Sequence, residues 1–216
     1  MRLKKIIKQL EGKFPLELAE EWDNVGLLLD STRREIKSIM LCLDITRDVV
    51  DKAVANKVDL IISHHPFIFS PLKKITTDEV NGEKILKLAR NNIAVYSMHT
   101  NIDSGIGGLN DFIIKKIGQE GKVFAISNNR SIELRKLVTS DLIDAKDKII
   151  NPLRIQKLKN FITIEELCKI IKEKLCIPNV RVVGDTAKLV KSYAICTGSG
   201  MSFSGNVKKK ADVFIT

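Results

Sequence analysis

The chain has 216 residues, of which 44% are hydrophobic and 29% charged, a balance typical of a soluble globular protein with core enough for one large domain or two small ones. No apolar run approaches the roughly 18 residues that cross a bilayer, which argues against a membrane span. The basic first residues lack the apolar region and cleavage site of a secretory signal. We therefore expect a cytoplasmic protein.

The net charge of +10 raises the question of nucleic-acid binding. The basic residues are spread along the whole chain, and only residues 208–210 form a run of lysines. Aromatic residues make up 5% of the chain, so the sequence contains no basic patch interleaved with aromatic residues that would stack on single strands. A diffusely solvated, lysine-rich surface is favoured over a nucleic-acid site.

The four cysteines are scattered, and none forms a C-x-x-C pair. This spacing argues against a thiolate zinc site and against a disulfide framework. We expect most of them to be small buried apolar residues in a reducing compartment. They are Cys42, Cys168, Cys176 and Cys196.

The first residues predict a helix that leads into a turn and a strand. Apolar residues recur at helical spacing over 2–10, and Gly12 offers a natural end. The single tryptophan, Trp22, precedes the turn and is interpreted as a core anchor. The alternative is that Asp23 or Asn24 beside it lines a pocket.

Three apolar strands follow, at 36–44, 59–63 and 93–98, and helical patterns at 47–56 and 82–91 separate them. This βαβαβ order requires a mostly parallel sheet with right-handed crossovers. The fold class predicted for the whole chain is α/β, a mostly parallel sheet flanked by helices, in two linked α/β domains.

A glycine-rich loop with Gly105, Gly107 and Gly108 leads into a helix at 109–117. Glycine loops before helices favour anions, so a phosphate cradle is one interpretation. Neither a Walker A pattern nor a complete G-x-G-x-x-G is present. A loop beside a metal site that meets the substrate is therefore favoured.

The second part of the chain is less regular. Residues 119–160 are polar and rich in lysine, which indicates a smaller α/β portion or a dimerisation region. Thr163 followed by Glu166 predicts a capping box for a helix to residue 175. Short strands are predicted at 180–183, 192–196 and 211–216. We place the domains at 1–118 and 119–216, with the last strand returning to the first domain.

The central strand runs directly into His64, His65 and Pro66. Proline cannot donate to a sheet ladder, so the strand is expected to end at the histidines. Side chains of neighbouring strand residues point to opposite faces, and two adjacent histidines meet only where the strand has ended.

All three histidines of the chain, His64, His65 and His99, follow predicted strands, and Asp44 and Asp103 lie at or just past strand ends. The carboxyl ends of parallel strands share one edge of a sheet, so these five side chains should converge there. Histidine with carboxylate suits Zn, Fe, Mn or Ni. Adjacent histidines could serve two divalent ions bridged by Asp103. The alternative, hydrogen-bonded structural histidines, is less favoured for this pattern.

Two stretches, Asp-Leu-Ile-Ile-Ser-His-His-Pro at 59–66 and His-Thr-Asn-Ile-Asp at 99–103, resemble the signature motifs of the NIF3-like (DUF34) family, whose bacterial members are called GTP cyclohydrolase 1 type 2 homologues. Further segments match in order at 21–27, 43–44, 107–110 and 198–200. The resemblance spans nearly the whole chain. It implies two linked α/β domains, a dinuclear metal centre and a hexameric ring whose sites face an inner cavity.

Carried over residue by residue, the resemblance implies that His64, His65 and Asp103 are metal ligands. His99 opens the second motif and is expected to bind the metal or to support a ligand, as is Asp44. The family continues past the strand that resembles 211–216 into a segment with a further histidine and glutamate ligand, and this sequence ends before both. Water, substrate or a neighbouring subunit would then complete the coordination, or metal binding would be weakened. The last strand would also be left with an exposed edge.

Two functions follow from these features. The first is a metal-dependent hydrolase acting on a nucleotide or a related phosphorylated or cyclic small molecule, of the GTP cyclohydrolase type by family name. The second is a non-catalytic metal-binding scaffold, metal chaperone or regulatory interaction protein. The sequence contains no purine-specific feature that would choose the substrate.

Overall fold

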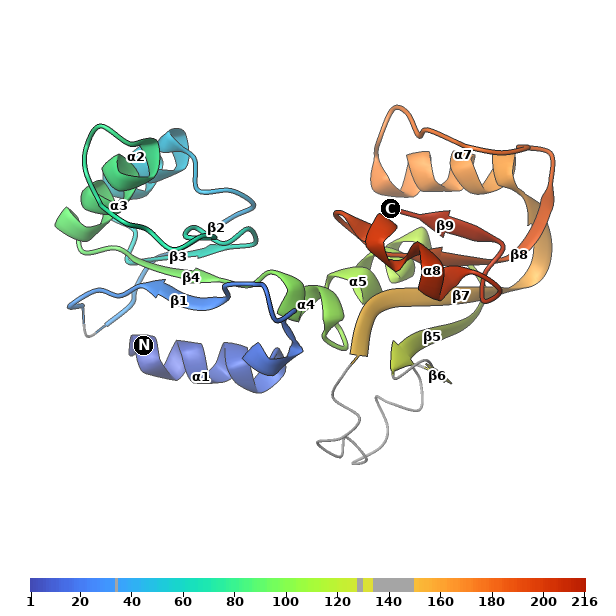
Figure 1. The fold of residues 1–216 in the computed structure, drawn as a ribbon, viewed down its shortest axis with the longest axis horizontal. Helices are drawn as coiled ribbons and strands as arrows, with labels where there is room; N and C mark the ends of the chain where they lie inside the picture. Colours follow the sequence, from blue (N-terminus) through green and yellow to red (C-terminus); the bar gives the residue numbers. More distant parts are fainter. Residues whose placement is uncertain (34, 128–129, 134–149) are drawn as a thin grey trace. The chain divides into compact units, whose positions relative to one another are not determined.

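A computed structural model describes residues 1–33, 35–127, 130–133 and 150–216 (Figure 1). The fold is a mixed α/β fold with two sheets flanked by helices. The chain forms two compact units, Met1–Ile102 and Asp103–Thr216. This division falls before the predicted boundary at 118, so Asp103 and the glycine-rich loop belong to the second unit.

The first unit is built on a four-stranded sheet in the order β1-β4-β3-β2. Its strands are β1 (Gly26–Leu29), β2 (Ile39–Cys42), β3 (Leu60–Ser63) and β4 (Ala94–Ser97). The pairs β2–β3 and β3–β4 are parallel, as the βαβαβ pattern predicts. Strand β1 is antiparallel to β4, with Gly26 opposite Ser97. The start of β1 therefore lies at the edge where the parallel strands end.

Helices cover both faces of this sheet. They are α1 (Leu3–Lys13), the 3-10 turn η1 (Leu16–Leu18), α2 (Arg47–Ala55) and α3 (Val80–Arg90). Figure 1 shows α1 on one side of the strands and α2 and α3 on the other. Neighbouring residues of β3 separate accordingly: Leu60 packs with the core that includes Leu3 of α1, and Ile61 packs with the core that includes Leu88 of α3.

The second unit is built on a five-stranded sheet in the order β6-β5-β7-β8-β9. Its strands are β5 (Gly121–Ser127), β6 (Arg130–Glu133), β7 (Ile150–Thr163), β8 (Leu189–Ile195) and β9 (Val213–Ile215). All pairs are antiparallel except β8–β9. The expectation that the last strand returns to the first domain is corrected here, because β9 pairs with β8 within the second sheet.

Among its described residues, the second part of the chain has five helical segments. They are α4 (Thr100–Ser104), α5 (Leu109–Ile117), α7 (Ile164–Leu175), the 3-10 turn η2 (Gly200–Phe203) and α8 (Ser204–Val207). Ile117 of α5 and Leu167 of α7 pack with Tyr193 of β8 in one core. The predicted capping box is confirmed: the Thr163 side chain accepts from the Glu166 backbone, and the Glu166 carboxylate accepts from Thr163.

Other expectations are changed by the structure. Residues 180–183 form no strand. Within 119–160 the described residues form antiparallel β5, β6 and β7, and residues 134–149 lie outside the described part of the chain. Trp22 is 60% exposed, so its interpretation as a core anchor is wrong. Leu28 and Leu29 of β1 pack instead against the core formed with α2 and α3, and Trp22 is not part of that core.

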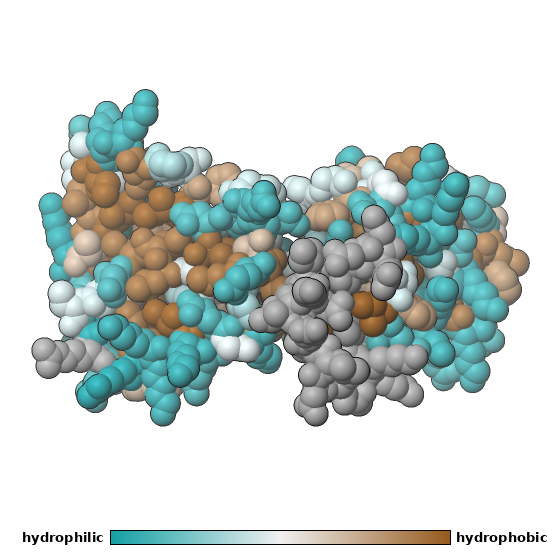
Figure 2. Space-filling model, turned by 60° about the horizontal axis from the view of Figure 1, so that its bottom comes forward, coloured by the Kyte–Doolittle hydropathy of each residue, from teal (hydrophilic) through white to brown (hydrophobic). Residues whose placement is uncertain are grey.

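The first unit leaves apolar side chains at its surface. Ile39, Leu41 and Leu43 are exposed along edge strand β2 and just beyond it. Figure 2 shows that apolar side chains also gather on one exposed face of the first unit. In the described part of the chain, no helix is long and apolar enough to cross a membrane.

Candidate metal centre

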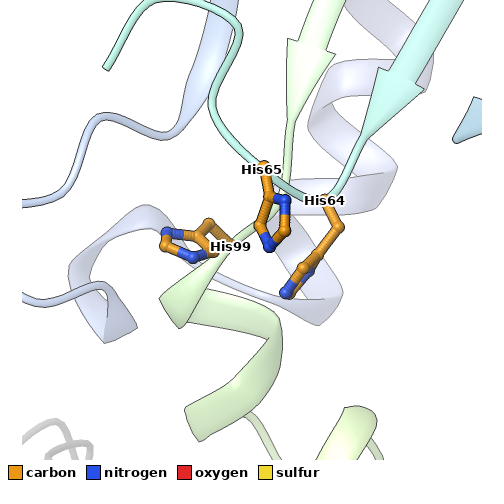
Figure 3. A group of neighbouring side chains, drawn as sticks. All are labelled: His64, His65 and His99. Carbon is orange, nitrogen blue, oxygen red and sulfur yellow. The ribbon is translucent and has the colours of Figure 1, made fainter. Parts of the chain in front are cut away.

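Three imidazoles meet at the edge of the first sheet, just beyond β3 and β4 (Figure 3). One nitrogen from each of His64, His65 and His99 lies within 4.8 Å of the others. The ring centroids are 5.1 to 5.7 Å apart. The predicted convergence of the histidines is therefore present within the first unit.

The end of β3 explains why adjacent histidines can point to one place. The strand ends at Ser63, and the backbone N–H groups of His64 and His65 donate to the carbonyls of Cys42 and Leu43, at 3.0 and 2.9 Å. The Ser63 hydroxyl donates to the His65 carbonyl at 2.9 Å. These bonds fix the backbone after the strand in a turned path, so the alternation of side chains no longer applies.

Each imidazole is oriented by a hydrogen-bond acceptor at its Nδ1. The partner of His64 is the Met98 carbonyl at 2.9 Å, that of His65 is Asp44 Oδ1 at 2.7 Å, and that of His99 is Asp23 Oδ1 at 2.9 Å. A carbonyl or ionised carboxylate only accepts, so each Nδ1 carries the proton. In the neutral form of such a ring the lone pair lies on Nε2, which is the arrangement found in histidines that ligate metals.

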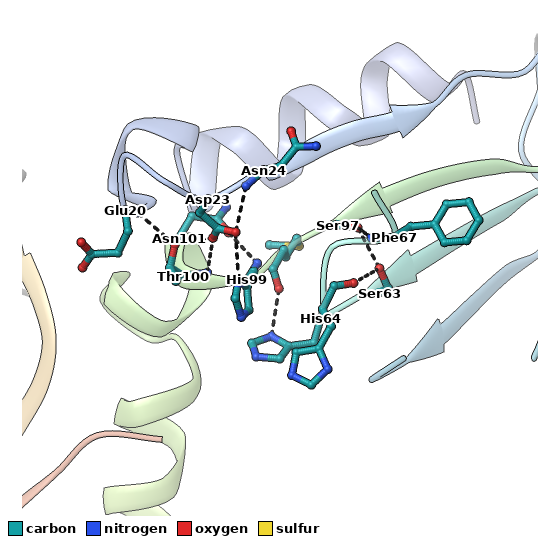
Figure 4. A network of polar contacts seen from close by, with 12 residues as sticks. Glu20, Asp23, Asn24, Ser63, His64, Phe67, Ser97, His99, Thr100 and Asn101 are labelled. Carbon is teal, nitrogen blue, oxygen red and sulfur yellow. Dashed lines mark hydrogen bonds and ion pairs between the residues drawn. The ribbon is translucent and has the colours of Figure 1, made fainter. Parts of the chain in front are cut away.

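Among the three acceptors, Asp23 makes the most hydrogen bonds, although the sequence indicates for it no more than a place in a pocket wall (Figure 4). Its side chain is fully buried. Beyond His99, it accepts from the Thr100 N–H at 3.0 Å and from the Thr100 hydroxyl at 2.5 Å. The Thr100 hydroxyl in turn accepts from the Glu20 N–H at 2.9 Å.

Burial raises the pKa of Asp23, but the hydrogen bonds from His99 and Thr100 outweigh it and hold that pKa below its ordinary value. Asp23 is therefore ionised at neutral pH and can only accept. The sequence pattern does not reveal this role, because it depends on β1 running antiparallel to β4: residues before β1 then meet residues after β4, which a wholly parallel sheet does not bring together.

His64 is suited to bind a cation as a neutral ligand. Burial, followed by the neighbouring charge of His99, lowers the pKa of His64, and the Met98 carbonyl opposes this only in part. The ring is therefore uncharged at neutral pH. A neutral imidazole with a free Nε2 is the form that ligates transition metals.

The two predicted carboxylates occupy different places. Asp44 lies just after β2 and holds the His65 ring, which places it as the support of a candidate ligand. Asp103 lies on α4 in the second unit and is nearly buried. The three-imidazole cluster does not include Asp103 among the described residues, and its role as a ligand stays a prediction.

The backbone N–H groups of the glycine-rich loop in the second unit form hydrogen bonds within the loop and with the helix that follows it. The Gly107 N–H donates to Asp111 Oδ2 at 2.6 Å, and the Gly108 N–H donates to the Gly105 carbonyl at 3.0 Å. Gly107 has φ +73°, a conformation that favours glycine. Because these donors are satisfied within the loop, a phosphate cradle is not favoured, and contact of this loop with a substrate stays a prediction.

The donor set fits a divalent transition metal. Three imidazole nitrogens suit Zn, Fe, Ni or Cu, and three protein ligands leave a position open, as catalytic zinc sites do. Thiolates do not contribute, since the cluster contains only imidazoles. The site could therefore hold one ion that remains accessible to water or substrate.

The whole chain, residues 1–216, matches the model of the Duf34/NIF3 (NGG1p interacting factor 3) family. It is 35% identical over 217 residues to a "GTP cyclohydrolase 1 type 2 homolog" of Clostridium acetobutylicum, covering all of this chain and 75% of that protein. It is 32% identical over 226 residues to "NIF3-like protein 1" of Drosophila melanogaster, covering all of this chain and 68% of that protein.

The fold is similar to that of a solved structure, the Staphylococcus aureus hypothetical protein SA1388, with a TM-score of 0.80 and 30% identity over 99% of this chain and 78% of that one. The HcgD structure from Methanocaldococcus jannaschii gives a TM-score of 0.70 and 28% identity over 99% of this chain and 77% of that one. The match of the family model over every residue, with close relatives of the same kind, shows that this chain belongs to the DUF34/NIF3 family.

Proposed function

We propose that the protein is a metal-dependent hydrolase, with a divalent ion held by the Nε2 atoms of His64, His65 and His99. The observation that carries this proposal is the shared arrangement of the three rings, each of which is held by a hydrogen bond between its Nδ1 and an acceptor. One ligand atom from each of these three side chains lies within 4.8 Å of the other two, so the rings are placed to share one ion.

Such an ion supplies Lewis-acid activation of water at neutral pH. The residues of the chain have separate tasks around it. Asp23 and Asp44 keep the rings of His99 and His65 in the required tautomer. The carbonyl of Met98 does the same for His64. Asp44 and His65 are half-exposed, so a substrate can approach from their side.

The substrate class follows from the family name alone. Relatives called GTP cyclohydrolase homologues support a nucleotide or a related phosphorylated or cyclic molecule. A second ion, a hexameric ring and a cytoplasmic location remain part of this proposal, with Asp103 as the candidate ligand for the second ion. These elements rest on the resemblance and on the composition, and each requires its own measurement.

The histidine content of the chain gives a sharp test. The three histidines of the sequence are the three site residues, so the ring signals of histidine-labelled protein report on this site alone. Titration with Zn²⁺ should shift all three Nε2 resonances and leave the Nδ1 nitrogens protonated. Unchanged Nε2 resonances at saturating Zn²⁺ would overturn the metal site.

Activity is tested separately. Protein loaded with Zn²⁺, Mn²⁺ or Fe²⁺, its metal content measured by elemental analysis, is incubated with GTP, other nucleotides and cyclic dinucleotides, and products are separated by chromatography. We expect turnover that is lost in His65→Ala. Bound metal without turnover of any member of this panel would contradict the hydrolase and favour the non-catalytic scaffold or chaperone.

A further inference from the structure

A cavity of about 540 Å³ opens beside His65, within the first unit. Its walls come from the residues after β2, the loop after His65 and the first turns of α3. His65 and Asp44, which belong to the candidate metal centre, form part of this wall. The volume lies in the range of small-molecule sites, and a molecule bound here would lie against one of the metal-binding rings.

We propose that this cavity binds the part of the substrate next to the reacting bond, and that this part is a planar ring carrying a phosphate, as in a nucleoside monophosphate. The proposal rests on the proposed function, because it concerns the substrate of the same site. In this assignment Phe69 and Leu72 contact the ring, and Lys84 binds the phosphate.

Lys84 is placed to receive an anion. Its Nζ donates to the Ile45 carbonyl at 2.8 Å and lies 5.4 Å from the centroid of the Phe67 ring. An ammonium group has three N–H donors, so after the bond to Ile45 two remain for a ligand. The backbone bond and the contact with Phe67 hold the long side chain in place, which reduces the entropy lost when a ligand binds.

The charge opposing an anion in this cavity is Asp44. Its Oδ1 is occupied by the Nδ1 of His65. A divalent ion on the same ring would offset the carboxylate, so the loaded site presents net positive charge to a phosphate. Anion binding is therefore expected to be stronger with metal than without it.

Aromatic side chains also line the cavity. Phe67 is buried, whereas Phe69 is 54% exposed and packs at a tilt against Trp22, with ring centroids 6.0 Å apart. Trp22 in turn lies 6.1 Å from the His99 ring. An aromatic surface therefore runs from the cavity to the third imidazole. Exposed aromatic faces of this kind stack on the flat faces of bases.

The cavity wall is fixed in advance. The loop that carries Phe69 is held by Asn24, whose side-chain amide donates to the Ile68 carbonyl at 2.5 Å. At the other end of the loop, Gly82 of α3 approaches the backbone of Thr76 so closely that a Cβ would lie 2.1 Å from the Thr76 carbonyl oxygen. A preformed wall costs less ordering on binding than a mobile one.

The test compares GMP with guanosine by titration calorimetry on Zn²⁺-loaded protein. These probes share the ring and differ in the phosphate. We expect GMP to bind about 10- to 150-fold more tightly, because its phosphate adds a charge-assisted contact. Lys84→Met should bring the two affinities together. Phe69→Ala should weaken both probes by a similar factor, on the order of ten-fold.

Two control variants match these substitutions: one on the same helix as Lys84, and one at another exposed phenylalanine. Lys87, one turn further on α3, pairs with Asp51 outside the cavity, and Lys87→Met should leave the GMP preference unchanged. Phe112 is an exposed phenylalanine of the second unit, and Phe112→Ala should leave both affinities unchanged. Zn²⁺ content, measured for every variant, should match that of the wild type.

Equal binding of GMP and guanosine to the wild type, or an unchanged GMP preference in Lys84→Met, would overturn the assignment of the cavity. The result is independent of turnover because GMP binding requires no reaction. If no nucleotide is hydrolysed but the GMP preference depends on Lys84, the hydrolase fails and the cavity assignment stands. If nucleotides are hydrolysed and Lys84→Met retains the preference, the cavity assignment fails and the hydrolase stands.

Discussion

The histidine cluster of the first unit and the Arg154 cluster of the second unit differ in how their nitrogen atoms are used. Arg154 is fully buried, its Nε donates to Asp111, and its terminal nitrogens donate to four backbone carbonyls. Asp111 also accepts from the Gly107 N–H. Every described polar contact of this guanidinium ends on the protein itself, which fixes the glycine-rich loop.

In the histidine cluster the Nδ1 of each ring is hydrogen-bonded to an acceptor, and the three rings converge on one point. The difference distinguishes a structural polar cluster from a candidate ligand site: in the first, the donors of one guanidinium all bond to the surrounding protein, and in the second, three side chains converge, each held through one nitrogen. Side-chain type alone does not make this distinction, since both clusters contain buried charge and both adjoin strand ends or loops with glycine.

Breaking the structural cluster should give the largest effect. Arg154→Met leaves Asp111 buried without its cation and five donor contacts unmade, so we expect a loss of about 3–5 kcal/mol in the free energy of unfolding. Urea denaturation measures it. The double variant Arg154→Met with Asp111→Asn should recover part of the loss. A stability within 1 kcal/mol of the wild type, on the order of a surface substitution, would contradict this role.

A substitution in the candidate ligand site should lower the affinity for metal and leave the free energy of unfolding nearly unchanged. The His65 side chain is 46% exposed, so His65→Ala should change the free energy of unfolding without metal by less than about 1 kcal/mol. Zn²⁺ affinity, measured by competition with a chelator, should fall by more than about 100-fold because a ligand is removed. Unchanged affinity would place the ion elsewhere.

Weakening the supports of the rings should have a smaller effect. Asp23→Asn replaces an acceptor with a group that can also donate, so His99 loses the constraint on its tautomer. We expect Zn²⁺ affinity to fall about 10–100-fold. The His99 ring nitrogens, observed by NMR, should show mixed tautomers, which loss of packing alone would not produce.

Asp44→Asn is the matched variant, with the same change at a half-exposed position. Water can replace part of its contact with His65, so its effect on Zn²⁺ affinity should be smaller than that of Asp23→Asn. The reverse order would show that burial of the acceptor does not decide its importance.

The smallest expected effect is a pH dependence outside both clusters. Asp59 is buried, and its Oδ2 accepts from the N–H groups of Lys37 and Ser38 while Arg33 pairs with Oδ1. Burial raises the pKa of Asp59, but the two hydrogen bonds and Arg33 outweigh it and lower that pKa. The unfolded chain therefore binds a proton more readily than the folded one.

The stabilisation by Asp59 is complete above the unfolded pKa of about 3.9 and is lost as pH falls through the lower folded pKa. Urea denaturation between pH 7 and pH 3 should show a fall on the order of 1 kcal/mol that is absent in Asp59→Asn. An equal fall in both proteins would assign the acid sensitivity to other carboxylates.

Much of the site could be predicted because it depends on local rules. His64 and His65 follow a short apolar strand that Pro66 ends, and His99 follows the next strand, so their convergence required only a parallel sheet. The capping box at Thr163 and the helix at 109–117 are likewise set by nearby residues. These features depend on neighbours within a few positions in the chain.

The remainder depends on pairings that are remote in sequence. The role of Asp23 requires the antiparallel β1 beside β4, and periodicity does not give strand direction. The place of β9 likewise follows from its pairing with β8. Residues 180–183 have the composition of a strand but pair with none, because propensity is outweighed when no neighbouring strand is available.

The exposed indole of Trp22 has a practical consequence. It is the single tryptophan of the chain, and it stands 6.1 Å from the His99 ring. An open-shell ion such as Ni²⁺ or Co²⁺ bound at that ring would quench its emission, whereas a closed-shell ion would not. The tryptophan fluorescence of the unmodified protein would thus report the binding of such an ion in real time, without an added dye.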